Sequence, residues 1–210
     1  MSATTDSQAL AATPEAPAAV PRIGLLFGSF NPIHTGHLIL AEYFATRTDL
    51  AEVWLVLSPQ SPFKVGENLL PDIDRLALLE LAVANNSRLR AEAIELSLPR
   101  PNYTIVTLDT MRERYPSHEF VLLMGADNLA GLPRWRAADR LAQEFDLYAY
   151  PRPGVLLPKL VDFPRARIVA APLLDISGTF IRQSIRATQS IRYLVPSVVE
   201  QEILAKKYYS

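Results

Sequence analysis

Short apolar runs recur along the chain at the length of buried β-strands. They are rich in β-branched and aromatic residues, and Gly or Pro stands just beyond most of them. Continuous apolar runs of this kind are typical of parallel strands that are covered on both faces. Strands are predicted at 23–27, 53–57, 89–96, 120–124, 147–150 and 168–170.

Segments with helical periodicity alternate with these runs. Leu38, Ala41 and Phe44, for example, fall on one face of a helix. Helices are predicted at 38–47, 72–84, 103–115, 136–144, 179–187 and 197–208. The alternation favours an α/β fold, a doubly wound, Rossmann-like and mostly parallel sheet with helices on both faces. Such folds bind ligands beyond the carboxyl ends of their strands.

The first 20 residues depart from this pattern. Ala, Thr, Ser and Pro dominate them, and Asp6 and Glu15 are their only charges. With so little apolar bulk to offset the entropy of ordering, residues 1–20 are expected to form a disordered tail. They have neither the basic start nor the continuous apolar stretch of a secretory signal. Residues 21–210 are then expected to form a single domain.

Charge and composition exclude several classes of protein. The chain has 21 basic and 22 acidic residues and a formal net charge of −1, which predicts no nucleic-acid partner. No apolar run approaches the roughly 18 residues that span a bilayer, so no membrane partner and a cytoplasmic location are expected. The chain has no Cys, which excludes disulfides, Cys-based zinc sites and thiol nucleophiles.

The segment after the first predicted strand, GSFNPIHTGHL at 28–38, is the first candidate phosphate site. Gly28 and Gly36 allow close approach of the backbone to a ligand. A helix N-terminus supplies unpaired N–H groups and a partial positive charge. His34 and His37 are three residues apart, so both rings can lie on one side. The helix dipole is expected to lower their pKa, leaving neutral imidazoles that donate to phosphate oxygens.

Other interpretations of this segment exist. A His near a helix start is often a cap or a surface residue, and two His at this spacing also suit a metal ion, although no acidic third ligand lies on the same turn. The segment has neither the Gly-Lys-Ser/Thr end of a Walker A loop nor a G-x-G-x-x-G fingerprint. Its place between a strand and a helix favours stabilisation of the charge that develops in phosphoryl or nucleotidyl transfer.

A second candidate phosphate site lies at 175–182, DISGTFIR. Ser177 or Thr179 can cap a helix here, and Gly178 leaves the backbone accessible. Arg182 falls about one turn into that helix, where its guanidinium can bind phosphate oxygens. Taken alone, the segment also fits an ordinary capped helix with a solvated arginine.

Together the two segments resemble the signatures of the HxGH nucleotidyltransferase superfamily. The segment 28–37 is similar to its GSFNP and HxGH elements, and 176–182 is similar to its I-S-x-T-x-I-R element. The resemblance implies transfer of a nucleotidyl group from a nucleoside triphosphate to a phosphate-bearing acceptor, with release of pyrophosphate. The residues it implies for catalysis are His34, His37 and Arg182, and those for ATP are Gly28, Ser29, Phe30, Gly36, Gly125, Asp127, Ser177 and Thr179.

Over nearly all of 22–208 the chain resembles bacterial nicotinate-mononucleotide adenylyltransferases. The similar segments are 61–64 (SPFK), Arg75, 101–104 (PNYT), 125–129 (GADNL), 133–135 (PRW), 150–154 (YPRPG) and 193–196 (YLVP). By family analogy Trp135 stacks on the nicotinate ring and Thr104 reads its carboxylate, although a Trp in a helical pattern also fits the core. Lys64 and Arg152 complete the implied acceptor-binding residues.

Two positions in these segments leave questions open. Asp127 follows a strand end through Gly125, a place that fits a ribose contact, a helix N-cap, or both. Phe63 stands where relatives often carry His, so the role of that His toward the acceptor phosphate is missing or supplied by another residue.

The resemblance implies in-line attack by a phosphate oxygen of nicotinate mononucleotide on the α-phosphorus of ATP, giving deamido-NAD. A phosphomonoester is mostly a dianion at pH 7, so no general base is needed. Mg²⁺ is expected on the ATP phosphates and water, without a protein metal site. The alternatives are another acceptor (nicotinamide mononucleotide, phosphopantetheine, or glycerol phosphate with CTP) and a non-catalytic nucleotide-binding regulator. The sequence leaves the oligomeric state open, a homodimer included.

Overall fold

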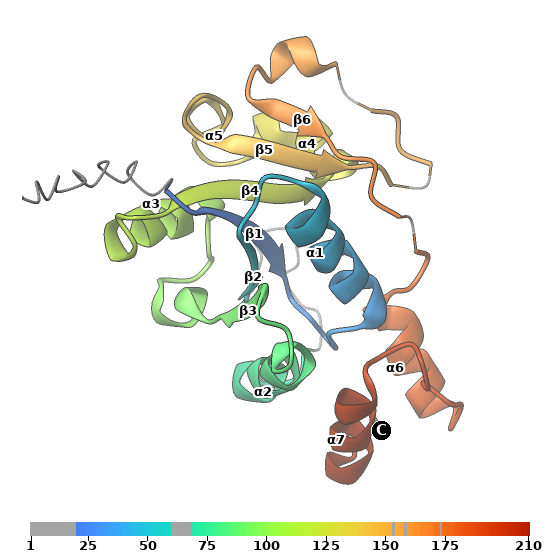
Figure 1. Ribbon diagram of the computed structural model, residues 1–210. Helices are drawn as coiled ribbons and strands as arrows, with labels where there is room; N and C mark the ends of the chain where they lie inside the picture. The colour runs from blue at the N-terminus through green and yellow to red at the C-terminus, as the bar shows by residue number, and fades with distance from the viewer. Residues whose placement is uncertain (1–19, 60–68, 153, 158, 173) are drawn as a thin grey trace, which may run out of the picture.

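The computed structural model describes residues 20–59, 69–152, 154–157, 159–172 and 174–210. Within them a six-stranded parallel sheet forms the centre of the molecule, in the order β3-β2-β1-β4-β5-β6 (Figure 1). Its strands are β1 (Arg22–Gly28), β2 (Glu52–Leu57), β3 (Leu89–Glu92), β4 (Glu119–Gly125), β5 (Asp146–Tyr150) and β6 (Ala166–Ile168). Of the tail predicted at 1–20, all but Val20 lies outside the described residues.

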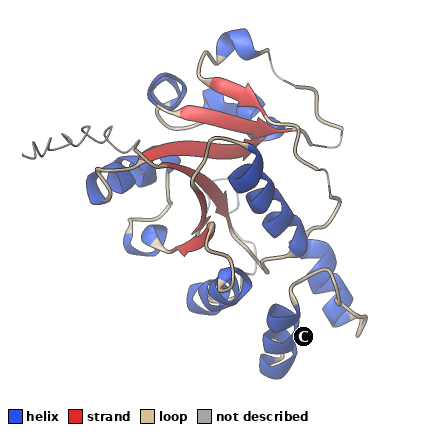
Figure 2. Cartoon of the chain, viewed as in Figure 1, coloured by secondary structure: helices blue, strands red, loops and turns tan. Residues whose placement is uncertain are grey.

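Helices cover both faces of the sheet (Figure 2). The α-helices are α1 (Thr35–Arg47), α2 (Asp72–Val83), α3 (Thr104–Arg114), α4 (Ala126–Gly131), α5 (Ala138–Glu144), α6 (Gly178–Arg186) and α7 (Ser197–Lys206). Three short 3₁₀ turns are η1 (Ile94–Ser97), η2 (Leu132–Arg134) and η3 (Leu160–Asp162).

Alternate residues of the central strands supply two separate hydrophobic cores. Leu55 of β2 packs in the core that α1, α2, α6 and α7 cover, whereas its neighbours Trp54 and Val56 pack in the core of α3, α4 and α5. Because successive side chains of a strand point to opposite faces, a sheet buried on both sides needs apolar residues at every position. The predicted doubly wound α/β fold is confirmed.

The strand order reverses between β1 and β4, which lie side by side in the middle of the sheet. β2 and β3 extend the sheet on one side, and β5 and β6 extend it on the other. In folds of this type the carboxyl ends of the two central strands mark the ligand site. Those ends are Gly28 and Gly125, two of the glycines that the sequence places in nucleotide-binding turns.

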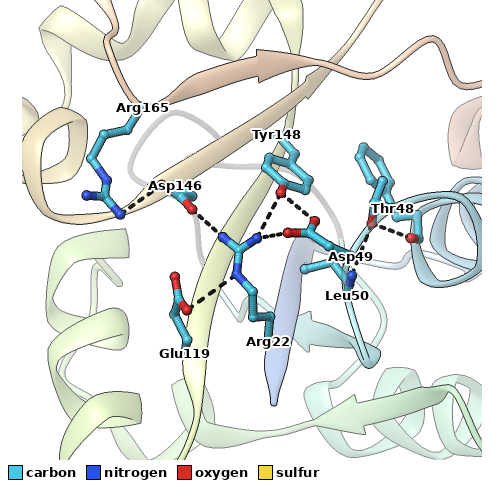
Figure 3. Close-up of polar contacts among 9 residues, drawn as sticks. Arg22, Thr48, Asp49, Leu50, Glu119, Asp146, Tyr148 and Arg165 are labelled. Atoms are coloured by element: carbon cyan, nitrogen blue, oxygen red, sulfur yellow. Dashed lines mark hydrogen bonds and ion pairs between the residues drawn. The ribbon is translucent and has the colours of Figure 1, made fainter. Parts of the chain in front are cut away.

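At the amino ends of the strands, opposite the switch point, a network of charged groups surrounds Arg22 at the start of β1 (Figure 3). Its guanidinium forms ion pairs with Asp49, with Asp146 at the start of β5, and with Glu119 at the start of β4, 3.4 Å away. It also donates to the hydroxyl of Tyr148 at 3.1 Å. The network fastens three strands to one another and to the end of α1.

Several boundaries differ from the prediction. α1 begins at Thr35, three residues before the predicted start, because Gly36 obscures the helical pattern. α4 was not predicted, since six residues are too few to show a period. β3 ends at Glu92, where the chain turns into η1. β6 spans Ala166–Ile168 instead of 168–170, as an edge strand paired only with β5. In the described residues, no helix has the length and apolar character to cross a membrane.

Candidate functional site

The first motif forms a compact turn between β1 and α1. His34 is the N-cap of α1, and His37 lies in its first turn. Their rings stack, with centroids 3.6 Å apart and planes 25° from parallel. The spacing of three residues therefore brings both imidazoles to one side, as predicted.

Burial determines the charge of His34. Its side chain is only 5% exposed, and loss of hydration lowers its pKa to about 4. For His34 the predicted direction is confirmed, with burial as the physical cause in place of the helix dipole. His34 is thus a neutral imidazole at pH 7. A β-carbon at Gly36 would lie 3.1 Å from His34 Nδ1, so glycine leaves room for this ring over the helix start.

Ser29 and Phe30 connect the strand to the two histidines. The Phe30 ring is buried and packs edge-on against His37, with centroids 5.1 Å apart. Its φ of 42° is left-handed, a conformation that a bulky residue adopts only when its surroundings impose it. The Phe30 ring therefore supports the His37 ring. Only the backbone of Phe30 remains for the ATP contact that the sequence implies.

The second motif meets the first at the start of α6 (Figure 1). Ser177 is the N-cap, and its Oγ accepts from the N–H of Phe180 at 3.2 Å. Arg182 donates through Nη1 to the carbonyl of Asn31 at 2.6 Å and through Nη2 to Thr179 Oγ1 at 3.2 Å. A β-carbon at Gly178 would lie 2.7 Å from the same Asn31 oxygen, so only glycine allows this approach. Two segments 151 positions apart form one surface.

The remaining residue of the HxGH element, Thr35, holds α1 to the chain beyond α6. Its Oγ1 donates to the carbonyl of Tyr193 at 3.0 Å, and its N–H donates to the carbonyl of Leu194 at 2.9 Å. Tyr193 has a left-handed φ of 67°, which presents that carbonyl to α1. The segment YLVP thus fixes the position of the first motif.

Across the switch point, Gly125 ends β4 and is itself the N-cap of α4. Asp127 lies in the first turn of that helix, so the N-cap role that the sequence offered for Asp127 is wrong. The helix starts at Ala126, two residues earlier than that role requires. The Asp127 carboxylate is 44% exposed and lies 3.4 Å from Nε of Arg152, which follows β5. Both side chains are accessible at the carboxyl edge of the sheet.

The residues implied for the acceptor come from separate segments. Thr104 is the first residue of α3. The ring of its predecessor Tyr103 packs against the guanidinium of Arg136, whose Cζ lies 4.7 Å from the ring centroid. Arg136 follows Trp135, which is half-buried against the core of α3 and lies after the turn η2 instead of inside a helix. The Tyr103–Arg136 contact therefore brings the two implied segments together. Lys64 lies outside the described residues.

Two residues that bind the loops together lie in the segments that resemble the family, but the sequence assigned them no role in the site. Asn31 is buried and accepts from the N–H of Leu70 at 3.1 Å, and its Nδ2 has no partner among the described residues. Arg75 is fully buried on α2 and donates to backbone carbonyls beneath both loops. Asn31 belongs to the GSFNP element and Arg75 to a segment that resembles the family, but neither pattern indicates these hydrogen bonds.

Among the described residues, no three His, Asp or Glu side chains converge in a way that would hold a metal ion. The described carboxylate beside the switch point, Asp127, is already near Arg152.

Comparison with known proteins agrees with this geometry. Residues 25–184 match the cytidylyltransferase-like family. The chain is 49% identical over 189 residues to a probable nicotinate-nucleotide adenylyltransferase of Cytophaga hutchinsonii, covering 90% of this chain and 98% of that protein. It is 40% identical over 192 residues to a protein of the same name from Flavobacterium johnsoniae, with the same coverage.

A solved structure has the same fold. The nicotinic acid mononucleotide adenylyltransferase of Plasmodium falciparum, complexed with NaAD, superposes with a TM-score of 0.74 over 90% of this chain and 97% of that one, at 19% identity. At this identity the likeness concerns the fold alone. The sequence matches carry the assignment further: this chain belongs to the cytidylyltransferase-like nucleotidyltransferases and, among them, to the nicotinate-nucleotide adenylyltransferase family.

Proposed function

We propose that this enzyme transfers the adenylyl group of ATP to nicotinate mononucleotide, giving deamido-NAD and pyrophosphate in NAD biosynthesis. The observation that carries the proposal is the hydrogen bond from Arg182 to Asn31, which joins the two phosphate motifs beside a neutral histidine. One surface then offers helix N-termini, imidazole groups and a guanidinium to a triphosphate.

The attacking group is a phosphate oxygen of the mononucleotide, and the α-phosphorus of ATP accepts it while the bond to pyrophosphate breaks. The attacking phosphate is mostly a dianion at pH 7, so the protein need not remove a proton. Its task is to hold two polyanions in line and to stabilise the charge that develops. His34 and His37 serve this role by N–H donation, while Arg182, Ser177 and Thr179 hold the β- and γ-phosphates.

Residues at the central strand ends complete the ATP site. The turns at Gly28 and Gly125 let the backbone approach the nucleotide, and Ser29 and Phe30 offer backbone groups beside them. The exposed carboxylate of Asp127 suits a ribose hydroxyl. Mg²⁺ accompanies the ATP phosphates and neutralises part of their charge.

The acceptor lies on the side of α3 and η2. Trp135 supplies a flat apolar surface for the nicotinate ring, and Thr104 at the start of α3 supplies hydrogen bonds to its carboxylate. Arg152, half exposed after β5, and Lys64 supply positive charge for the acceptor phosphate.

The test is pyrophosphate release from ATP and Mg²⁺ with nicotinate mononucleotide, nicotinamide mononucleotide or phosphopantetheine in parallel reactions. We expect the highest kcat/KM with nicotinate mononucleotide and the dinucleotide as co-product. Activity with phosphopantetheine alone would overturn the acceptor, and ATP binding without turnover on any acceptor would favour a regulator. Fractionation and mass measurement in solution test the cytoplasmic location and a homodimer.

A further inference from the structure

The guanidinium of Arg75 lies completely buried beneath the loops of the site. It is tied to its own helix start, since Nε donates to the carbonyl of Leu70 at 2.9 Å and Nη2 to Asp72 Oδ1 at 2.5 Å. Through Nη1 it donates to the carbonyl of Ser58 at 3.1 Å and to the carbonyl of Ser29. A charge without access to water persists only with such complete pairing.

Two of these acceptors belong to the carboxyl ends of adjacent strands. Ser29 follows β1 and Ser58 follows β2, and the N–H of Ser58 also donates to the carbonyl of Gly28 at 2.9 Å. The bond to Ser29 fixes the peptide just before Phe30, the residue with the left-handed φ that supports His37. Arg75 therefore constrains the loop that leads to the histidines.

A second chain of contacts runs from Arg75 toward the acceptor residues. Asp72 binds Arg75 through Oδ1 and forms an ion pair with Arg100 through Oδ2. Arg100 stands four residues before Thr104, on the segment that leads into α3. One carboxylate thus joins the buried guanidinium to the segment implied in nicotinate recognition.

We propose that Arg75 and Asp72 are positioning residues that hold the ATP loop (28–37) and the acceptor loop (100–104) in a fixed position relative to each other. The proposal rests on the function proposed above. An arginine suits this task because its planar group presents five donors in fixed directions, whereas lysine presents three on a flexible stem. Phosphoryl-type transfer depends strongly on the alignment of its reactants, and a displacement of about 1 Å can cost 10²-fold in rate.

Three variants and a matched control test the proposal. Arg75→Lys retains the charge and loses the fork, so we expect kcat to fall at least about 30-fold while circular dichroism remains native. Asp72→Asn retains an oxygen that can accept from Arg75 but loses the carboxylate charge that Arg75 and Arg100 share. We expect it, like Arg100→Met, to raise KM for the mononucleotide about 10-fold and KM for ATP less than twofold.

The control is Asp74→Asn, on the same helix. Asp74 accepts from the hydroxyl of Tyr208 at 2.8 Å, and Asp74→Asn keeps the acceptor oxygen but removes its charge, so the hydrogen bond that attaches α2 to the chain just after α7 becomes weaker. Asp74→Asn should lower the thermal midpoint and leave both KM values and kcat unchanged. This separates positioning from the general stability of α2.

The outcomes discriminate clearly. Wild-type kinetic constants in Arg75→Lys, or losses that merely follow thermal midpoint as in Asp74→Asn, would overturn the proposal. If Arg75→Lys does not fold, an unchanged acceptor KM in both Asp72→Asn and Arg100→Met overturns it equally. Absence of turnover in the wild-type enzyme would instead refute the proposed function. The affinity of Arg75→Lys for ATP, measured by calorimetric titration, would then replace the kinetic test. An affinity equal to that of the wild type would count against an effect of Arg75 on the ATP loop.

Discussion

The amino ends and the carboxyl ends of the sheet strands use arginine in opposite ways. At the amino ends of the strands, Arg22 is surrounded by Asp49, Glu119 and Asp146 (Figure 3). At the carboxyl ends, Arg182 donates to a backbone carbonyl and a threonine hydroxyl, and within the described ranges it has no carboxylate partner.

This difference separates stability from binding. A guanidinium among carboxylates is neutralised, and its hydrogen bonds fasten elements to one another. A guanidinium held by neutral acceptors keeps its charge and attracts a polyanion. The carboxyl edge also retains buried polar atoms without partners among the described residues, at Asn31 and His34. Variants at the two edges should therefore fail in different assays.

The largest effect is expected for His37→Ala. Loss of one donor to the developing charge should lower kcat by about 10²–10³-fold, with little change in thermal midpoint. Steady-state kinetics and calorimetric melting check this directly. Turnover near the wild-type value in a folded variant would remove the transition-state role from His37.

A pH experiment tests the burial of His34. The unfolded His34 takes up a proton near pH 6.5, whereas the folded group does so only near pH 4, so acid favours the unfolded chain in that interval. Between pH 6.5 and 4 the wild type should lose up to roughly 3 kcal/mol more stability than His34→Gln, which does not titrate. Urea unfolding of both proteins at several pH values provides the difference. Equal pH dependence would mean that folding does not lower the pKa of His34.

Arg22→Met should produce the opposite pattern to His37→Ala. It leaves three acidic groups without their shared partner, and because the Arg22 side chain is 20% exposed, water screens part of the cost. The free energy of unfolding should fall by about 2 kcal/mol while kcat at 25 °C remains within twofold. A loss of kcat at full stability would break the distinction between the edges.

The smallest effect is expected for Trp135→Ala. KM for nicotinate mononucleotide should rise about 10-fold through loss of stacking, while KM for ATP changes less than twofold. Trp135→Phe, which retains an aromatic ring, should recover most of the difference. Equal rises in both KM values would indicate that Trp135 acts only in packing.

The fold follows from the sequence because both cores leave a local trace. Residues such as Trp54 and Leu55 must be apolar on successive positions, and that run identifies a strand covered on both sides. Short elements leave no such trace. The six residues of α4 and the turn η2, which ends just before Trp135, depend on contacts with the body of the fold.

The candidate site is predictable where its chemistry is written in consecutive residues. His34, His37 and Arg182 belong to recognisable motifs, and the structure brings those motifs together. Arg75 and Asn31 act through backbone carbonyls and amides of distant segments, which carry no signature in a sequence. Their roles become visible only when the chain is folded.

The two hydrogen bonds of Thr35 have a consequence for how the enzyme folds during its synthesis. The carbonyl that binds Thr35 Oγ1 is synthesised 158 positions later, so the start of α1 with its two histidines is held in place only after nearly the whole domain has left the ribosome. Nascent chains that end before Tyr193 lack this attachment and present an incomplete helix start. Translation thus delivers the nucleotide-handling surface at its end, and chains released early should carry little of the activity.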